Sequence, residues 1–258
     1  YRSPPHRRNY TSSLVEPDVW YVRRMITETR IESRFNGPPN SGNGGYSCGV
    51  IAEGVDGVAS VRLRVPPPLD RPLVLESDGV KATLTDGDVV VGEASSADLE
   101  IDVPTIPTIA EAEQASKGYA GFTEHAFPTC FVCGPERAIG DGLRIFAGPL
   151  DDSLYAAPWI PDASLTGADG DIEPRYVWAA LDCPSFFSNP GAPTALLGQL
   201  TAEVHRVPEV GEPIVAIAWP IRTEGRKHWA RSALATNDGE LIGAAEALWI
   251  EPKDGIPT

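Results

Sequence analysis

Two short stretches of this chain carry residues whose types and spacing suit chemistry, and the first is a glycine turn. Asn43-Gly44-Gly45-Tyr46 opens an apolar stretch of helical length. The first N–H groups of a helix have no intrahelical partner, and glycine lets another molecule approach them closely. Such a turn can polarise a carbonyl oxygen. The alternative is a tight turn that binds nothing. We expect Gly44 and Gly45 to be catalytic, and Asn43 and Tyr46 to bind substrate.

The second stretch contains an acid in apolar surroundings, Ala179-Ala-Leu-Asp182-Cys183. A carboxylate placed there can act as a general base on water or as a nucleophile. The alternative is that Asp182 orients the chain before Pro184, because Asp-x-Pro often marks a helix end. We favour the catalytic interpretation, and we assign Trp178, one turn earlier, to substrate binding.

The spacing of the cysteines gives little support for a metal site. Cys130-Phe-Val-Cys133 has the spacing of a zinc knuckle, but no second pair with this spacing exists, and Cys48 and Cys183 lie in apolar helical contexts. A lone CxxC is weak evidence for zinc or for redox chemistry, and four cysteines in 258 residues do not make a disulfide scaffold. The pattern favours a pair of small buried residues. We therefore expect no metal and no cofactor.

The elements that must position these residues occur twice, in the same order. Two alternating segments are each interrupted by Asp-Gly, which indicates a hairpin whose turn requires positive φ. Two further segments each consist of a strand, a prolyl connection and another strand. Each of them is preceded by its own apolar stretch of helical length. The matched segments are 81–94 with 232–246, 64–75 with 205–216, and helical stretches 44–54 with 174–187.

This repeat predicts an α+β fold built of two antiparallel sheets, each wrapping one central helix, and joined as a pseudo-dimer. Each half has a normal domain size. We expect the first half to begin with a strand over 27–35, and the linker to contain a short helix over 109–117. The predicted boundaries are an N-terminal extension 1–26, a first half 27–103, a linker 104–127 and a second half 128–258.

The charge of the chain excludes several partners. Its 36 acidic and 21 basic residues give a net charge of −15, which argues against nucleic acid, against anionic membranes and against an acidic carrier protein. No apolar run approaches the ~20 residues that span a bilayer. The first ten residues lack the apolar core of a signal peptide, so we expect a cytoplasmic protein.

Several of these segments resemble a known family. Thr129-Cys-Phe-Val-Cys-Gly-Pro-Glu-Arg137, followed by Asp141-Gly-Leu-Arg-Ile-Phe146, resembles the opening of the phenylacetate-pathway type thioesterases. The segment 177–182 resembles the helix that carries the catalytic acid of that family, 226–251 resembles its last hairpin, and Asn43–Tyr46 resembles the turn that opens its helix. The resemblance covers about 30–103 and 128–251. It implies a tandem hotdog fold and an acyl-CoA thioesterase-like activity.

The resemblance also implies how the site is assembled. The two ends of one helix stand roughly 13 Å apart, so a turn and an acid on the same helix cannot reach one carbonyl carbon. Hotdog thioesterases pair two helices antiparallel. Here the first half has the glycine turn but Ala52 and Glu53 at the acid position, whereas the second has Asp182 but the segment 173–175 in place of the turn. We therefore expect a single asymmetric site, in which Gly44 and Gly45 face Asp182.

The chain departs from the family on the strand after the second helix. Where the family usually has a Ser or Thr that orients water, this chain has Leu197, and we assign Gln199 as the substitute. Arg226 and Lys227, an adjacent basic pair, are expected to bind the phosphates of CoA, which is part of the substrate and not a cofactor.

Three further interpretations concern the activity and the assembly. One alternative is a non-catalytic protein that binds an acyl thioester, a small molecule, in the same cleft. Dehydratase chemistry ranks last, since it requires a histidine on or before a helix and neither helix has one. A homodimer is also expected, because the sheets have edges to bury.

Overall fold

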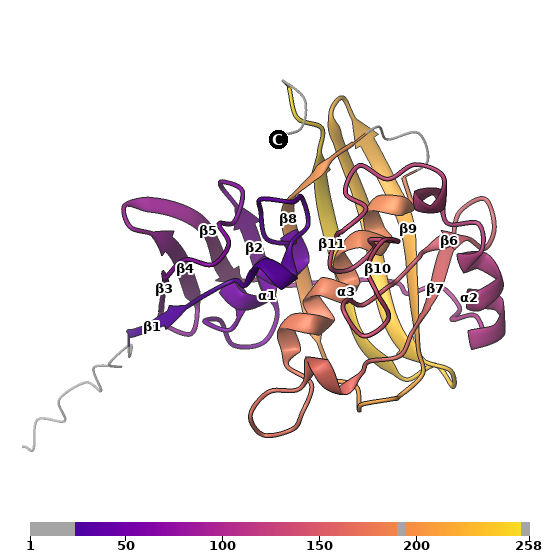
Figure 1. The fold of residues 1–258 in the computed structure, drawn as a ribbon, viewed down its shortest axis with the longest axis horizontal. Coiled ribbons are helices and arrows are strands. Elements are labelled where there is room, and N and C mark those ends of the chain that lie inside the picture. The colour runs from indigo at the N-terminus through magenta and orange to yellow at the C-terminus, as the bar shows by residue number, and fades with distance from the viewer. Residues whose placement is uncertain (1–23, 190–193, 254–258) are drawn as a thin grey trace, which may run out of the picture.

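The computed structural model describes residues 24–189 and 194–253. In this part of the chain, eleven strands form one antiparallel sheet, in the order β1-β3-β4-β5-β2-β8-β11-β10-β9-β7-β6 (Figure 1). The strands are β1 (Met25–Thr29), β2 (Ala59–Leu63), β3 (Leu73–Ser77), β4 (Lys81–Asp86), β5 (Val89–Ser96), β6 (Gly148–Pro149), β7 (Tyr155–Trp159), β8 (Leu196–Val204), β9 (Ile214–Glu224), β10 (Lys227–Thr236) and β11 (Leu241–Ile250).

The two halves of the chain share this sheet. The sequence predicted two sheets, but β2 of the first half pairs antiparallel with β8 of the second and joins them edge to edge. Ser60 on β2 lies opposite Thr201 on β8, and their hydroxyl oxygens are 2.8 Å apart in a hydrogen bond. Pairing satisfies backbone groups that two separate sheets would leave exposed at their edges. The seam therefore makes one continuous sheet from the two repeats.

Two helices lie side by side over the seam, α1 (Gly44–Ala52) and α3 (Pro174–Phe187) (Figure 1). They run antiparallel, since the start of α1 meets the later part of α3 and the end of α1 meets its beginning. Glycines allow the close approach. A Cβ on Gly45 would lie 2.3 Å from the Cβ of Asp182, and one on Gly49 would lie 2.7 Å from the Cα of Arg175. The helical stretches predicted from the repeat are confirmed, with α1 ending two residues early.

One hydrophobic core unites both halves, and a second cluster lies on the other face of the sheet. Along β7, Ala157 belongs to the core under α1 and α3, whereas its neighbour Ala156 belongs to the second cluster. Successive residues of a strand point to opposite faces, so α2 (Ile109–Ser116) covers the face opposite α1 and α3. A capping box formed by Thr108 and Glu111 starts α2. The segment predicted as a linker, 104–127, therefore supplies this covering helix.

The turn and strand predictions have mixed outcomes. The Asp-Gly turns join β4 to β5 and β10 to β11, and Gly87 and Gly239 have φ of +57° and +90°, which confirms the predicted positive φ. The strand predicted over 27–35 is shorter: β1 ends at Thr29, and Ser33–Phe35 forms a 3-10 turn. Most of the predicted extension 1–26 lies outside the described residues, and its last two residues belong to β1. No helix of the described chain is long and apolar enough to cross a membrane.

Candidate active site

Asp182 lies inside α3 and reaches across to the start of α1. Its Oδ2 accepts hydrogen bonds from the backbone N–H of Gly45 at 2.9 Å and from Nδ2 of Asn43 at 3.0 Å. Its Oδ1 is buried and has no hydrogen-bond partner among the residues that the structure describes. The helix continues through Pro184 to Phe187, so Asp182 does not mark a helix end. One carboxylate oxygen is held by the first half of the chain, and the other is free.

The surroundings of Asp182 favour a neutral carboxyl more than water does. Only 1% of its surface is exposed. This burial raises the pKa of Asp182 to about 7, and the hydrogen bonds from Gly45 and Asn43 limit the rise. A carboxyl with a pKa in this range can accept a proton at neutral pH and return it within one reaction cycle.

The start of α1 is capped by a side chain and packed closely against β8. Asn43 is its N-cap, and the side-chain Oδ1 accepts a hydrogen bond of 2.9 Å from the N–H of Tyr46. The same side chain therefore caps α1 through its oxygen and holds Asp182 through its nitrogen. Gly44, the first helical residue, lies against Leu197 so closely that a Cβ would come within 2.8 Å of the Cβ of that leucine.

A cavity of about 1220 Å³ opens beside this junction. Asp182, Asn43 and Gly44 line it, together with Leu197 from β8. Gly45 does not face this space, and its N–H is already bonded to Asp182. The expectation that both glycines polarise a carbonyl is therefore corrected: Gly45 orients the acid, and only Gly44 presents backbone to the cavity.

The opposite junction of the two helices has a different composition. There, the start of α3 meets the end of α1, and Arg175 forms an ion pair of 2.9 Å with Glu53 and a second contact of 3.4 Å with Glu173. An arginine side chain thus occupies the position that corresponds to the glycine turn, as the sequence comparison of the two halves indicated. The two junctions are unequal: among the described residues, a buried carboxylate oxygen without a partner lies only at the junction that contains Asp182.

Comparison with solved structures identifies the fold. An acyl-CoA thioesterase II of Mycobacterium marinum is 11% identical, with a TM-score of 0.55 over 90% of this chain and 97% of that one. A protein with a hot dog fold from Alicyclobacillus acidocaldarius is 11% identical, with a TM-score of 0.56 over 92% and 97%. The dehydratase domain of a mycocerosic acid synthase-like polyketide synthase is 12% identical, with a TM-score of 0.62 over 90% and 92%. The chain has the hotdog fold.

The likeness extends no further than the fold. No protein-family model matches the sequence, and a search of curated proteins gives no match. The hotdog structures above include both a thioesterase and a dehydratase domain, so their shared architecture does not select a reaction. The residues around the cavity must do so.

Besides Gly45, three residues assigned from the sequence to the helices and to β8 do not line the cavity of this hotdog protein. Gln199 lies at the sheet seam, where its Oε1 accepts a hydrogen bond of 2.9 Å from Arg62 and its Nε2 donates one of 3.0 Å to Ser60. Tyr46 is buried and stacks on Phe35, with ring centroids 4.1 Å apart. Trp178 packs in the contact between the two helices. The sequence placed Leu197 at the site correctly, since Leu197 lines the cavity, but the substitute Gln199 does not reach it. The pairing of β8 with β11 shifts register between Leu197 and Gln199, which breaks the alternation of faces that the prediction assumed.

The predicted basic pair divides between two locations. Arg226 lines the cavity, and its Nη1 donates a hydrogen bond to the carbonyl oxygen of Glu251. Lys227 is exposed at the start of β10 and is not part of the cavity wall. Arg64, at the end of β2, lines the same cavity as Arg226 and pairs with Glu93. Two arginines therefore belong to the cavity wall.

His125 is a cavity residue that sequence reasoning missed. Its Nδ1 accepts a hydrogen bond of 2.9 Å from the N–H of Phe127, which places the proton on Nε2. This Nε2 is buried without a partner among the described residues, and the imidazole lines the cavity. Burial lowers the pKa of His125, which favours the neutral ring. The histidine is on neither helix but in the segment after α2, so no helix pattern could indicate it.

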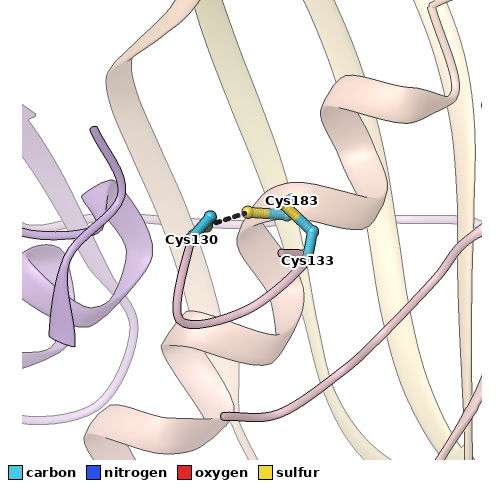
Figure 2. A group of neighbouring side chains, drawn as sticks. All are labelled: Cys130, Cys133 and Cys183. Atoms are coloured by element: carbon cyan, nitrogen blue, oxygen red, sulfur yellow. Dashed lines mark hydrogen bonds between the residues drawn. The ribbon is translucent and has the colours of Figure 1, made fainter. Parts of the chain in front are cut away.

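Three of the four cysteines meet beside Asp182. Cys130 and Cys133, from a loop before β6, lie next to Cys183 of α3 (Figure 2). Neighbouring Cys133 and Cys183 thiols hold the pKa of Cys130 well below its usual range, whereas hydrogen bonding to Cys130 and burial raise the pKa of Cys183. The sequence assigned Cys130 and Cys133 as an isolated buried pair, and the fold adds a third thiol to them.

Proposed function

We propose that this protein hydrolyses acyl thioesters, with acyl-CoA as the substrate class, at a single site between two hotdog units fused in tandem. The observation that carries the proposal is the buried, unpartnered Oδ1 of Asp182 in the wall of a large cavity beside the start of α1. A buried acceptor without a partner is unfavourable in a folded protein and is characteristic of functional sites. A bound water molecule or substrate would supply the missing hydrogen bond.

The proposed reaction uses residues from both halves. Oδ1 of Asp182 takes a proton from a water molecule, and the oxygen of that water attacks the thioester carbonyl carbon. The carbonyl oxygen becomes an oxyanion beside the N–H of Gly44 at the positive end of α1. The carbon–sulfur bond then breaks, the thiolate leaves with the proton that Asp182 accepted, and the products are a carboxylic acid and a free thiol. Asn43 and Gly45 act as positioning residues, because they hold Oδ2 and leave Oδ1 free.

The shape and charge of the cavity support an acyl-CoA substrate. Its volume of about 1220 Å³ exceeds that of many small-molecule sites and accommodates an acyl chain with its pantetheine arm. Arg64 and Arg226 provide positive charge on its wall in a protein whose net charge is −15. Guanidinium groups suit phosphate recognition, so the phosphates of CoA are proposed to lie near these two residues.

Acyl-thioester binding without turnover is the second candidate function. The cavity wall has Leu197 at the position where the family that the chain resembles usually has a Ser or Thr that orients water. A leucine cannot hold a water molecule by hydrogen bonding. If no other group orients the water, the same cleft binds the substrate but does not cleave it.

The test is release of free thiol from a panel of acyl-CoA esters that varies in chain length and includes aryl groups. We expect turnover by the wild-type chain and loss of most turnover in Asp182→Asn, about 10²- to 10⁴-fold, as for removal of a general base. Asparagine keeps an oxygen that accepts from Gly45 and Asn43, so the fold should persist. The matched control is Glu53→Gln at the opposite helix junction, which should leave turnover unchanged.

Three outcomes would contradict hydrolysis at this site. Full turnover in Asp182→Asn excludes this acid as the base. Loss of turnover in Glu53→Gln but not in Asp182→Asn places the chemistry at the other junction. Thermal stabilisation of the wild type by acyl-CoA with no thiol release supports binding alone, and ligand at 100 times its Kd would add about 2.7 kcal/mol. Including 3-hydroxyacyl-CoA in the panel, with mass detection of water loss, distinguishes dehydratase activity.

A further inference from the structure

The three clustered cysteines have the arrangement of a metal site. Their sulfur atoms all lie within 4.8 Å of one another, and all three residues are buried. Figure 2 shows Cys130 and Cys133 on one loop with their side chains directed to Cys183 on α3. Cys183 lies 50 positions after Cys133 in the sequence, so the fold and not the CxxC spacing alone creates the cluster.

The spacing of the sulfur atoms fits a tetrahedral ion. Zinc binds cysteine sulfur at about 2.3 Å, and a tetrahedron with bonds of that length has ligand atoms about 3.8 Å apart. The sulfur atoms of Cys130 and Cys183 are 3.8 Å apart (Figure 2). A disulfide requires about 2.05 Å between two sulfur atoms and would leave the third cysteine unused. The distances therefore suit one ion shared by three thiolates.

The loop that carries two of the ligands is sharply folded. The N–H of Gly134 donates a hydrogen bond of 2.9 Å to the carbonyl oxygen of Cys130. A Cβ on Gly134 would lie 2.6 Å from the backbone nitrogen and oxygen of Cys130. Only glycine, which has no Cβ, fits this position without a clash. This turn places Cys130 and Cys133 on the same side of the loop, as a two-ligand knuckle requires.

An amide side chain and the cavity lie next to the three sulfur atoms. Nδ2 of Asn43 lies 3.8 Å from the sulfur of Cys130 and 3.7 Å from that of Cys183, so it can donate to either thiolate. Such contacts from outside the coordination sphere orient metal ligands. All three cysteines line the same cavity as Asp182. A fourth coordination position at this cluster is therefore accessible from the cavity.

We propose that Cys130, Cys133 and Cys183 bind one thiophilic divalent cation, zinc, and that the fourth coordination position is open to the cavity. Three protein ligands with one exchangeable position are typical of a zinc site that takes part in chemistry or binds a ligand, in contrast to closed four-cysteine sites. Thiolate ligands select zinc over magnesium or calcium. The ion would also fasten the loop of Cys130 to α3, beside the acid of the proposed active site.

The test uses the full chain, reduced and then incubated with zinc or cobalt under anaerobic conditions before removal of unbound metal. We expect about one zinc per chain by elemental analysis, in keeping with a single site. Cobalt(II) should give a thiolate-to-cobalt charge-transfer band together with the visible absorption of a tetrahedral complex. Zinc should slow the reaction of three of the four cysteines with a thiol reagent.

Variants separate coordination from general folding. Cys130→Ser, Cys133→Ser and Cys183→Ser should each weaken zinc binding at least tenfold and remove much of the charge-transfer band. Cys48→Ala is the matched control, because Cys48 is a buried cysteine of α1 outside the cluster, and it should bind zinc like the wild type. The cobalt spectrum of the wild type reports thiolate ligation even if one variant fails to fold.

Three results would overturn the site. The first is a reduced wild-type chain that takes up no metal and shows no charge-transfer band. The second is metal loss in Cys48→Ala equal to that in the cluster variants. The third is a Cys130–Cys183 disulfide, identified by mass spectrometry, in a chain that does not bind metal when reduced; this would make the cluster a redox pair.

Discussion

Gly45 and Asp182 are joined by a hydrogen bond of 2.9 Å that runs from the start of one helix to the interior of the other. The donor is a backbone N–H in the first half of the chain, and the acceptor is Oδ2 of an acid in the second half. Nδ2 of Asn43 donates to the same oxygen, so Oδ2 accepts both hydrogen bonds that Asp182 receives from the start of α1. The geometry of this junction therefore leaves Oδ1 as the carboxylate oxygen without a hydrogen-bond partner among the described residues.

The first prediction concerns the close approach of the helices at Gly45. In Gly45→Ala, the new Cβ would lie 2.3 Å from the Cβ of Asp182 and 2.7 Å from the carbonyl oxygen of Trp178. These atoms belong to a packed helix, so α1 and α3 must move apart. We expect the free energy of unfolding to fall by about 1–3 kcal/mol, measured by urea denaturation.

Gly167→Ala is the control for this change. At Gly167, the nearest atom to a new Cβ is Cγ of Glu173 at 3.2 Å, the middle of a flexible side chain. We expect a change within about 0.5 kcal/mol, as for an ordinary surface substitution. Equal destabilisation by the two variants would mean that the helix contact is not what restricts Gly45.

The second prediction separates the two roles of Asn43. Asn43→Ser keeps a good N-cap for α1 but removes the nitrogen that donates to Asp182. A hydrogen bond to a charged group contributes about 1.5–3 kcal/mol, so we expect the kcat for thioester hydrolysis to fall roughly tenfold or more. KM should change little, and the free energy of unfolding should fall by about 1–3 kcal/mol for the lost hydrogen bond. Steady-state kinetics with one acyl-CoA ester gives both parameters.

Ser41→Ala provides the comparison, since Ser41 is buried in the same turn and its hydroxyl donates only to the carbonyl oxygen of Gly42, at 3.4 Å. Its kcat should match the wild type. An equal loss in both variants, or a rise in KM alone for Asn43→Ser, would show that the turn as a whole, and not the Asp182 contact, supports turnover.

Much of the fold could be predicted because the sequence contains it twice. Local patterns that are repeated in the same order predict the hairpin turns and both helices. They also predict that the helices cover one face of a sheet. The pairing of β2 with β8 could not be predicted in this way, because edge-to-edge pairing depends on backbone groups that every strand has. Nothing in the side chains of these strands distinguishes one joined sheet from two.

The site shows the same division between local and long-range information. The contact of Gly45 with Asp182 was accessible from the sequence, since it follows from antiparallel helices and a glycine turn. Gln199 was misplaced because strand periodicity gives two faces but not which residue reaches the cavity. His125 and the third cysteine of the cluster were missed for another reason. They come from segments that only tertiary folding brings to the site.

The third prediction concerns the ion pair at the other helix junction. The side chains of Arg175 and Glu53 are 20% and 38% exposed, so their interaction lies between a surface pair and a buried one. We expect Arg175→Met to lower the free energy of unfolding by about 1–2 kcal/mol and to leave thioester hydrolysis unchanged. A double-mutant cycle with Glu53→Gln should give a coupling of about 0.5 kcal/mol or more.

A more exposed pair serves as the reference for this cycle. The arginine side chain of Arg71–Asp86 is 60% exposed, and Arg71→Gln should change stability by less than about 1 kcal/mol. If Arg175→Met is as harmless as Arg71→Gln, the junction is not stabilised by its ion pair. If it also abolishes hydrolysis, the two junctions do not have separate roles.

The last prediction tests the buried Nε2–H group of His125. It uses two substitutions, one that keeps only the acceptor at Nδ1 and one that keeps only the donor at Nε2. His125→Asn retains an acceptor for the N–H of Phe127 but lacks a group at the position of Nε2. His125→Gln retains a donor near Nε2 but not the acceptor. If Nε2 donates to bound substrate, acyl-CoA binding should weaken about fivefold in the asparagine variant, the equivalent of about 1 kcal/mol for one net hydrogen bond. The glutamine variant should bind more tightly than the asparagine variant, although the loss of its local hydrogen bond should make it the less stable of the two. Calorimetric titration with acyl-CoA, with both variants made in the Asp182→Asn chain to prevent hydrolysis, measures the order of binding, and urea denaturation measures the order of stability. If binding follows stability in both variants, His125 has a structural role only.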